Sequence, residues 1–104
     1  MKNIERTPGC IKRAMDVVGN KWTALILRDL ADSPKRFGEL QRNIDLNPRT
    51  LSQRLDSLIA ENIIESADVE HIAYKSYRLT AKGRDLLPIL HSMADWGDKY
   101  PSHR

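Results

Sequence analysis

The sequence contains one cysteine, few aromatic residues and no long apolar run. A single cysteine, Cys10, excludes an intrachain disulfide and is typical of a reducing compartment, so we expect a cytoplasmic protein. A membrane-spanning helix needs about 18 consecutive apolar residues, and a signal peptide needs an apolar stretch near the start. Neither is present, so we expect no association with a membrane.

Catalytic and metal-binding patterns are missing as well. The three histidines, His71, His91 and His103, lack the mutual spacing and the partner cysteines of a zinc site, and no glycine-rich phosphate loop is present. We expect no cofactor, no metal, no catalytic residue and no obligatory small-molecule ligand. The nearest enzyme hypothesis, with Cys10 as nucleophile, is disfavoured because a helical chain of 104 residues offers little room for a pocket.

Charge is distributed unevenly along the chain. The formal net charge is only +3, which permits binding to nucleic acid without requiring it. Residues 35–54 contain five basic and two acidic residues, whereas residues 55–73 contain five acidic residues and no Lys or Arg. A basic segment therefore lies next to an acidic one. The length suits one domain, residues 1–104.

The pattern of apolar residues predicts three helices before residue 45. Thr7-Pro8 is a cap with proline at the first helical position, and Asn20 can cap the second helix. A turn at residues 33–34, a very short strand at 36–37 and a third helix from Glu39 to Asn43 or Ile44 follow. Leu40 and Ile44 of the third helix are expected to point inward. The apolar residues that recur on the first two helices are Ile11, Ala14, Met15 and Val18 on one face of the first, and Trp22, Leu25, Ile26 and Leu30 on the second.

A tight turn at residues 45–47 precedes a fourth helix, which Asn47-Pro48 starts and Asn62 ends in the left-handed conformation. Its inward residues are Leu51, Leu55, Leu58 and Ile59. A β-hairpin is expected from strands at 63–67 and 74–79, joined by a loop at 68–73. Thr80 caps a last helix, in which Pro88 makes a kink or a local start.

Two short helices joined by a tight turn and followed by a hairpin predict a winged helix-turn-helix, a mainly α fold with a small β-hairpin wing. The fourth helix would be the recognition helix that enters the major groove of double-stranded DNA. Arginine can bond guanine and glutamine can bond adenine, while flanking basic residues hold phosphates. The predicted DNA contacts are Lys35, Arg36, Arg42, Pro48, Arg49, Thr50, Ser52, Gln53, Arg54, His71 and Lys75.

Two alternatives stay open for these residues. The polar side of the fourth helix is also typical of an ordinary helix face that is exposed to solvent and binds nothing. His71 and Lys75 are equally well explained as solvated polar groups of a loop. A winged helix that binds RNA or another protein, without sequence-specific DNA binding, is the alternative function, since the hairpin is acidic.

Several motifs together resemble the HxlR-type family of regulators. They are the segment Gly19–Leu30, the RFGEL of 36–40, the RTLSQRL of 49–55, the YRLTAKG of 77–83 and the Trp96-Gly97 pair. The resemblance runs in family order from Cys10 to Gly97. It implies a prokaryotic, dimeric regulator of transcription with a DNA-binding core at about 20–80 and dimerisation helices at about 8–18 and 81–99.

The sequence departs from the family pattern at several positions. Asn20 replaces the second glycine of GGKW, and Asn62 replaces a glycine after the recognition helix. The strand that follows reads ESAD where arginine is usual, and EHIA replaces a proline-containing wing. We therefore expect weak contact between the wing and DNA.

The ends of the chain carry two further expectations. More apolar residues lie there than one small core can cover, so we expect a two-fold interface formed by Ile11, Met15, Val18, Leu86, Leu90, Met93 and Trp96. The alternative places all of them in the core of one chain. Cys10 is either a sensor of oxidants or electrophiles, because a helix N-terminus and neighbouring basic residues stabilise a thiolate, or a small buried hydrophobe.

Overall fold

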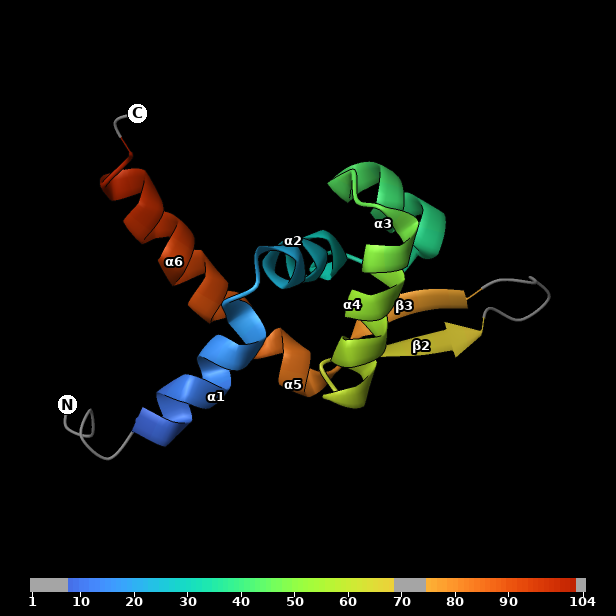
Figure 1. Ribbon diagram of the computed structural model, residues 1–104, viewed down its shortest axis with the longest axis horizontal. Helices are drawn as coiled ribbons and strands as arrows, with labels where there is room; N and C mark the ends of the chain where they lie inside the picture. Colours follow the sequence, from blue (N-terminus) through green and yellow to red (C-terminus); the bar gives the residue numbers. More distant parts are fainter. Residues whose placement is uncertain (1–7, 69–74, 103–104) are drawn as a thin grey trace.

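The computed structural model describes residues 8–68 and 75–102, which form six helices and a three-stranded antiparallel sheet in the order β1-β3-β2 (Figure 1). This is the mainly α, winged helix-turn-helix architecture that the sequence predicts. The elements are α1 (Pro8–Val18), α2 (Lys21–Leu30), β1 (Lys35–Arg36), α3 (Phe37–Ile44), α4 (Pro48–Ala60), β2 (Ile64–Asp68), β3 (Lys75–Leu79), α5 (Ala81–Arg84) and α6 (Leu87–Lys99).

Side-chain caps start the helices where the sequence predicts. The amide oxygen of Asn20 accepts hydrogen bonds from the backbone N–H groups at the start of α2, and Asn47 does the same for α4. The hydroxyl of Thr80 accepts from the N–H of Gly83 at 3.0 Å and so caps α5. Asn62 follows α4 with φ of 63°, the left-handed conformation predicted for it.

The core lies where α2, α3 and α4 meet the sheet. Leu51, Leu55 and Leu58 are buried as predicted, but Ile59 is 38% exposed, so its predicted burial is wrong. A helix packed on one side buries a narrow stripe, and Ile59 lies at the edge of the stripe that these leucines form. The buried cluster comprises Ile26, Leu27, Leu30, Leu40, Leu46, Leu51, Leu55, Leu58, Ile63, Ile64 and Leu79.

Several boundaries differ from the predicted ones. The strand expected at 36–37 lies at 35–36, and Phe37 already begins α3. The cause is Glu39, whose carboxylate accepts a hydrogen bond from the backbone N–H of Arg36 at 2.8 Å and fixes the first helical turn there. The first hairpin strand begins one residue later than predicted, at Ile64, whereas the predicted start of the second, residue 74, lies outside the described residues.

The expected last helix is divided into two. α5 ends at Arg84, and α6 begins at Leu87 with Pro88 in its first turn, so the proline sets a local start. In Figure 1 α6 and α1 both project from the same end of the molecule, away from the sheet. Within the described ranges, no helix is long and apolar enough to cross a bilayer.

Gly83 lies at a position where the fold leaves no room for a side chain. A Cβ atom there would overlap the backbone carbonyl oxygen of Ile63, where α5 crosses the start of β2. We predict that Gly83→Ala lowers the free energy of unfolding in urea by about 3 kcal/mol or more, because backbone cannot move aside as a side chain can. Gly9→Ala is the control, since nothing lies within 4 Å of a Cβ at Gly9. Equal stability of the two variants would contradict this packing.

Candidate nucleic-acid interface

A tight turn sets the angle between α3 and α4. Asp45 ends α3 in the left-handed conformation, with φ of 61°, and its N–H donates to the carbonyl of Gln41 at 2.8 Å. Two residues later, the side chain of Asn47 accepts hydrogen bonds from the N–H groups of Arg49 at 2.8 Å and Thr50 at 3.3 Å. The chain therefore reverses within three residues, and α4 starts abruptly with its N-terminus exposed.

The exposed side of α4 is polar. Arg49, Ser52, Gln53 and Asp56 are all exposed, whereas the leucines on the other side are buried. Pro48 is exposed at the first position of the helix, and Thr50 is half-buried at the edge of this face. The structure thus gathers most of the predicted recognition residues on one surface.

Arg54 lies elsewhere on the same helix. At about 100° per residue it is rotated by about 140° from Arg49, and its side chain is half-buried toward α1. Arg54 is among the predicted DNA contacts although helical spacing does not place it beside Arg49. The structure separates it from the face that carries Arg49 and Gln53.

Three predicted DNA-contact residues come together between α3 and the sheet. Arg36 and Arg42 lie at opposite ends of α3, and Lys75 comes from β3, yet all three line one cleft of about 510 Å³. Glu39 lies in the same cleft, and its pKa is lowered, mainly by the hydrogen bond from the N–H of Arg36. The cleft is therefore a surface of mixed charge with an excess of cations.

Tyr77 on β3 lines this cleft and is half-buried. Burial raises the pKa of its phenol, and the nearby carboxylate of Asp56 raises it further. The phenol therefore stays a neutral hydroxyl at physiological pH, able to donate a hydrogen bond.

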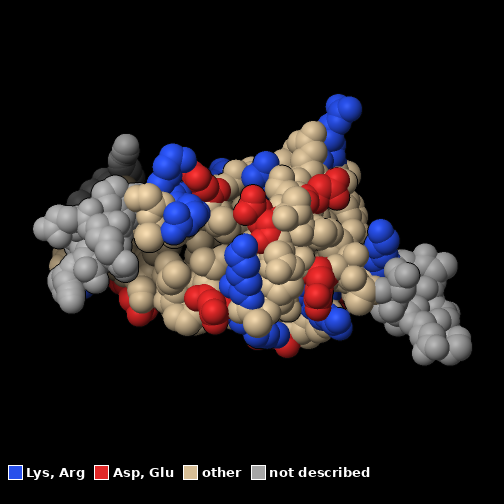
Figure 2. Space-filling model, turned by 90° about the horizontal axis from the view of Figure 1, so that it is seen from below, with Lys and Arg blue, Asp and Glu red and all other residues tan. Residues whose placement is uncertain are grey.

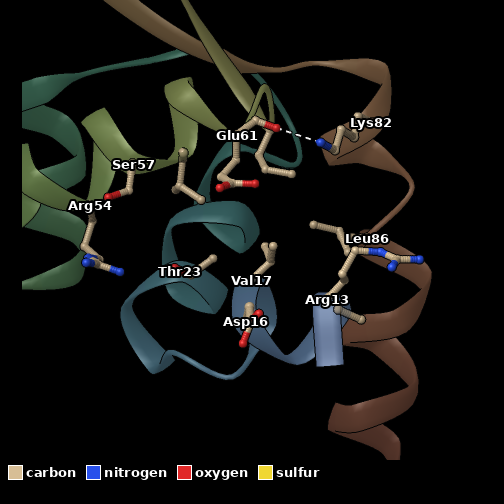
Figure 3. A pocket seen from close by; sticks show the side chains of 12 residues that line it. Arg13, Asp16, Val17, Thr23, Arg54, Ser57, Glu61, Lys82 and Leu86 are labelled. Carbon is tan, nitrogen blue, oxygen red and sulfur yellow. Dashed lines mark hydrogen bonds between the residues drawn. The ribbon is translucent and has the colours of Figure 1, made fainter. Parts of the chain in front are cut away.

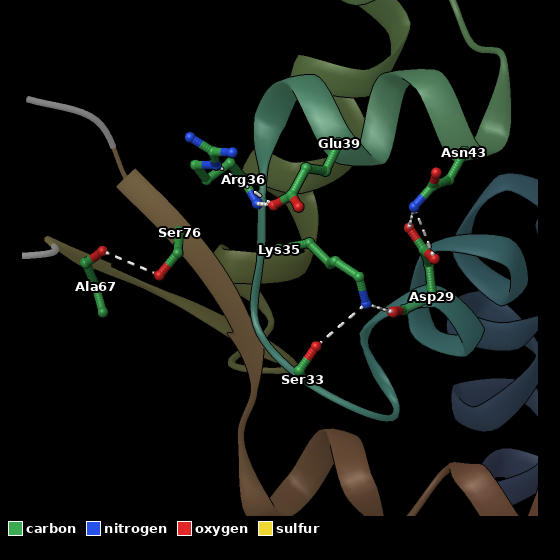
Figure 4. Close-up of polar contacts among 8 residues, drawn as sticks. All are labelled: Asp29, Ser33, Lys35, Arg36, Glu39, Asn43, Ala67 and Ser76. Carbon is green, nitrogen blue, oxygen red and sulfur yellow. Dashed lines mark hydrogen bonds and ion pairs between the residues drawn. The ribbon is translucent and has the colours of Figure 1, made fainter. Parts of the chain in front are cut away.

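Lys35 has a structural partner. Its Nζ donates to the carbonyl of Asp29 at 2.7 Å and lies 3.4 Å from the hydroxyl of Ser33 (Figure 4). It thereby satisfies a carbonyl in the last turn of α2. Asn43 also binds this turn through the carboxylate of Asp29 at 3.0 Å, a link between α2 and α3 that no sequence pattern indicates.

The hairpin holds one arginine that the sequence analysis did not select. Arg78 on β3 is paired with Glu65 on β2, its direct neighbour across the sheet, at 2.7 Å. An exposed pair of this kind neutralises the charge without adding much stability. Of the two predicted wing contacts, Lys75 is exposed, and His71 lies outside the described residues.

Acidic and basic residues are interspersed on the side of the molecule that carries α5. Figure 2 views the protein from the side of α5, away from α3, and there Lys or Arg and Asp or Glu side chains are interspersed without a continuous basic patch. The cluster of Arg36, Arg42 and Lys75 belongs to the region of α3 and the sheet instead.

The predicted interface residues fall into two groups. Val18 is buried, and Leu86 and Leu90 pack against the core of the same chain. Ile11, Met15, Met93 and Trp96 are exposed, with Trp96 at 66%. Ile89 and Tyr100 are exposed as well, although the sequence analysis did not select them.

Cys10 is exposed in the first turn of α1. A guanidinium N–H of Arg13 donates to its sulfur at 3.2 Å. The alternative of a buried cysteine is therefore wrong for the single chain.

Comparison with known proteins agrees with this geometry. The sequence profile of the HxlR-like helix-turn-helix family matches residues 17–104. Rv3095 of Mycobacterium tuberculosis, named an uncharacterized HTH-type transcriptional regulator, is 39% identical over 94 residues, which are 86% of this chain and 58% of that protein. This chain thus spans somewhat more than half the length of that relative. BH0655 of Halalkalibacterium halodurans, with the same description, is 37% identical over 95% of this chain and 88% of its own length.

A solved structure has the same fold. The reduced form of the transcriptional regulator YodB from Bacillus subtilis superposes with a TM-score of 0.80 at 30% identity, covering 88% of this chain and 91% of YodB. YodB has also been solved in quinone-bound and diamide-treated forms.

Proposed function

The chain belongs to the family of HxlR-like helix-turn-helix transcriptional regulators, and on this basis we propose that it binds double-stranded DNA sequence-specifically as a homodimer. The observation that supports this most is the abrupt, exposed start of α4, with Arg49, Ser52 and Gln53 on its outer side. A recognition helix contacts base edges with the residues of its N-terminal part. The setting we propose is the cytoplasm, where a bacterial or archaeal regulator meets DNA.

Base contacts and backbone contacts divide between two surfaces. On α4, Arg49 suits a guanine and Gln53 an adenine, each through two hydrogen bonds, while Thr50 and Ser52 reach base edges or phosphates. The cleft of Arg36, Arg42 and Lys75, between α3 and β3, suits a phosphate. Lys35 keeps one N–H donor beyond its bonds to the carbonyl of Asp29 and the hydroxyl of Ser33, so it is engaged with its own chain and contributes less.

In this proposal a second copy of the chain covers the exposed apolar residues of α1 and α6. On α6, Ile89, Met93, Trp96 and Tyr100 follow one another at intervals of four, three and four residues, the spacing of a helix seam packed on another helix. Every residue from 91 to 100 is exposed in the single chain. Ile11 and Met15 on α1 are exposed too, one helical turn apart. A two-fold dimer would place two α4 helices on an inverted repeat.

We further propose that Cys10 makes DNA binding sensitive to oxidants or electrophiles. The sulfur is exposed, and the cation of Arg13 lies beside it. Because α1 contributes to the proposed dimer surface, a group added to Cys10 would change the angle between subunits. The quinone-bound and diamide-treated forms of YodB show that a similar protein meets such reagents.

The assignment of α4 is tested by single substitutions. Arg49→Ala and Gln53→Ala should each lower the preference for operator over random duplex by about 1–3 kcal/mol, because each removes a two-bond contact with one base. Arg36→Ala should weaken binding to both duplexes and lower the salt slope by about one. Fluorescence anisotropy at several salt concentrations measures both, with Arg28→Ala on α2 as control. An unchanged preference in Arg49→Ala would show that α4 does not contact bases.

The proposed dimer is tested by a charge on the α6 seam. Met93→Glu should give a monomer at micromolar concentration in sedimentation velocity, because a carboxylate cannot be buried between apolar helices without large cost. His91→Glu adds the same charge to the same helix, outside the seam residues, and should leave the dimer intact. A parent protein that sediments as a monomer would contradict the proposal.

The role of Cys10 is tested by diamide, which oxidises two thiols to one disulfide and is itself reduced to the hydrazine. With one cysteine per chain, the disulfide must join two chains or one chain and a small thiol. We predict a change in DNA affinity of about 5- to 150-fold on oxidation, reversed by dithiothreitol and absent in Cys10→Ser. A Cys10→Ser variant that responds like the parent would refute the sensor.

A further inference from the structure

Two clefts of similar size differ in the charges that line them. The cleft between α1, α4 and α5, of about 530 Å³, has three basic and two acidic residues, and Figure 3 shows Lys82 donating there to the backbone carbonyl of Glu61 at 2.8 Å. The cleft between α3 and β3, of about 510 Å³, has three basic residues and one acidic residue. The carboxylate of that one, Glu39, is bound by Arg36. The cleft between α3 and β3 therefore has the larger excess of positive charge.

The alternation of side chains along β3 adds an uncharged donor to this cleft. Lys75 and Tyr77 are two residues apart, so they point to the same side of the strand, about 7 Å from each other along it. Both line the cleft, together with Arg42 of α3. Ser76 points to the other side of the strand, and its hydroxyl donates to the carbonyl of Ala67 at 3.4 Å (Figure 4).

The hydroxyl of Tyr77 is accessible to a ligand. Among residues 8–68 and 75–102, which the structure describes, it has no hydrogen-bond partner. No buried side-chain nitrogen or oxygen of these residues lacks a partner, so the phenol oxygen must be in contact with solvent. The ring itself is half-buried and packs against the core. The core therefore fixes the ring, while the hydroxyl stays open to solvent.

The phenol also lies close to the side of α4 that is proposed to contact bases. Burial raises the pKa of Tyr77, and the charge of the Asp56 carboxylate raises it further, so this carboxylate is near the phenol. Asp56 comes seven residues after Arg49, which returns it to the same side of α4. Both are exposed. A duplex bound to that side of α4 would therefore lie near the cleft.

We propose that Tyr77 contacts the DNA backbone, its hydroxyl donating a hydrogen bond to a phosphate that Arg42 and Lys75 hold in the cleft. This inference rests on the proposed function. Tyrosine hydroxyls are among the groups that bind phosphate oxygens, and such contacts orient a protein on the duplex without reading its sequence. Arg42 and Lys75 are long, exposed side chains that lose conformational entropy when they bind, whereas the ring of Tyr77 is held by the core beforehand.

The test compares Tyr77→Phe with the parent by fluorescence anisotropy, on a random-sequence duplex and on a selected operator. We expect affinity to fall about tenfold, because a hydrogen bond to a charged group is lost, and to fall equally on both duplexes. The salt slope should stay that of the parent, since a neutral hydroxyl releases no counterion, whereas Arg42→Gln should lower it by about one. Ser76→Ala removes a hydroxyl from the other side of β3 and should bind like the parent.

A double variant tests whether Tyr77 and Arg42 share one phosphate. In the Arg42→Gln background the phosphate is held less firmly, so Tyr77→Phe should lower affinity by a smaller factor than it does in the parent. An equal factor in both backgrounds would show that the two residues contact different groups, and would overturn the shared site.

The remaining outcomes separate this inference from the proposed function. A parent that binds neither duplex would refute both. A parent that binds DNA and a Tyr77→Phe variant that binds it equally well would refute the contact of Tyr77 alone. Urea unfolding of Tyr77→Phe should match the parent, because the hydroxyl has no partner within the described chain. A clearly lower midpoint would show that the hydroxyl stabilises the fold instead, and would also overturn the proposal.

Discussion

Burial of one face of α4 determines how the rest of the molecule is used. Leu51, Leu55 and Leu58 are at most 4% exposed, and burying three leucine side chains contributes roughly 5–9 kcal/mol. This packing fixes the rotation of the helix about its own axis. Once it is fixed, Arg49, Ser52 and Gln53 face outward, and Arg54 is turned toward α1. The same constraint therefore separates Arg54 from the proposed DNA surface.

The helices at the two ends of the chain, α1 and α6, pack less extensively against this core. α1 contributes Val18 and α6 contributes Leu90 to the packing within one chain, but most of both helices is exposed. Exposed apolar seams on two projecting helices are costly in a monomer and useful in a dimer. An assembly of this kind would couple the spacing of two α4 helices to small movements at α1, where Cys10 lies.

Local chemistry explains which parts of the fold were predictable. Asn47-Pro48 and Thr80 start helices through their own side chains, and Asn62 adopts the left-handed conformation, so these boundaries follow from neighbouring residues. The early start of α3 depends on one carboxylate, that of Glu39, reaching back three residues. The sequence permits this hydrogen bond, but the spacing of apolar residues does not predict it.

Contacts between distant segments account for what the sequence could not predict. Lys35 was assigned to DNA, but its ammonium is bound by a carbonyl of α2. Arg54 is predicted as a DNA contact from its residue type, whereas only the packing of α1 shows that it lines the cleft beside that helix. The cluster of Arg36, Arg42 and Lys75 forms only because β3 lies beside β1, although each residue was selected individually.

The central claim is that a symmetric pair of α4 helices recognises base sequence, and selection of bound duplexes from random-sequence DNA tests it most directly. The account predicts enrichment of an inverted repeat with half-site centres about 34–36 Å apart, or a multiple of that distance. Enrichment of no sequence, or of a single half-site without symmetry, would contradict it.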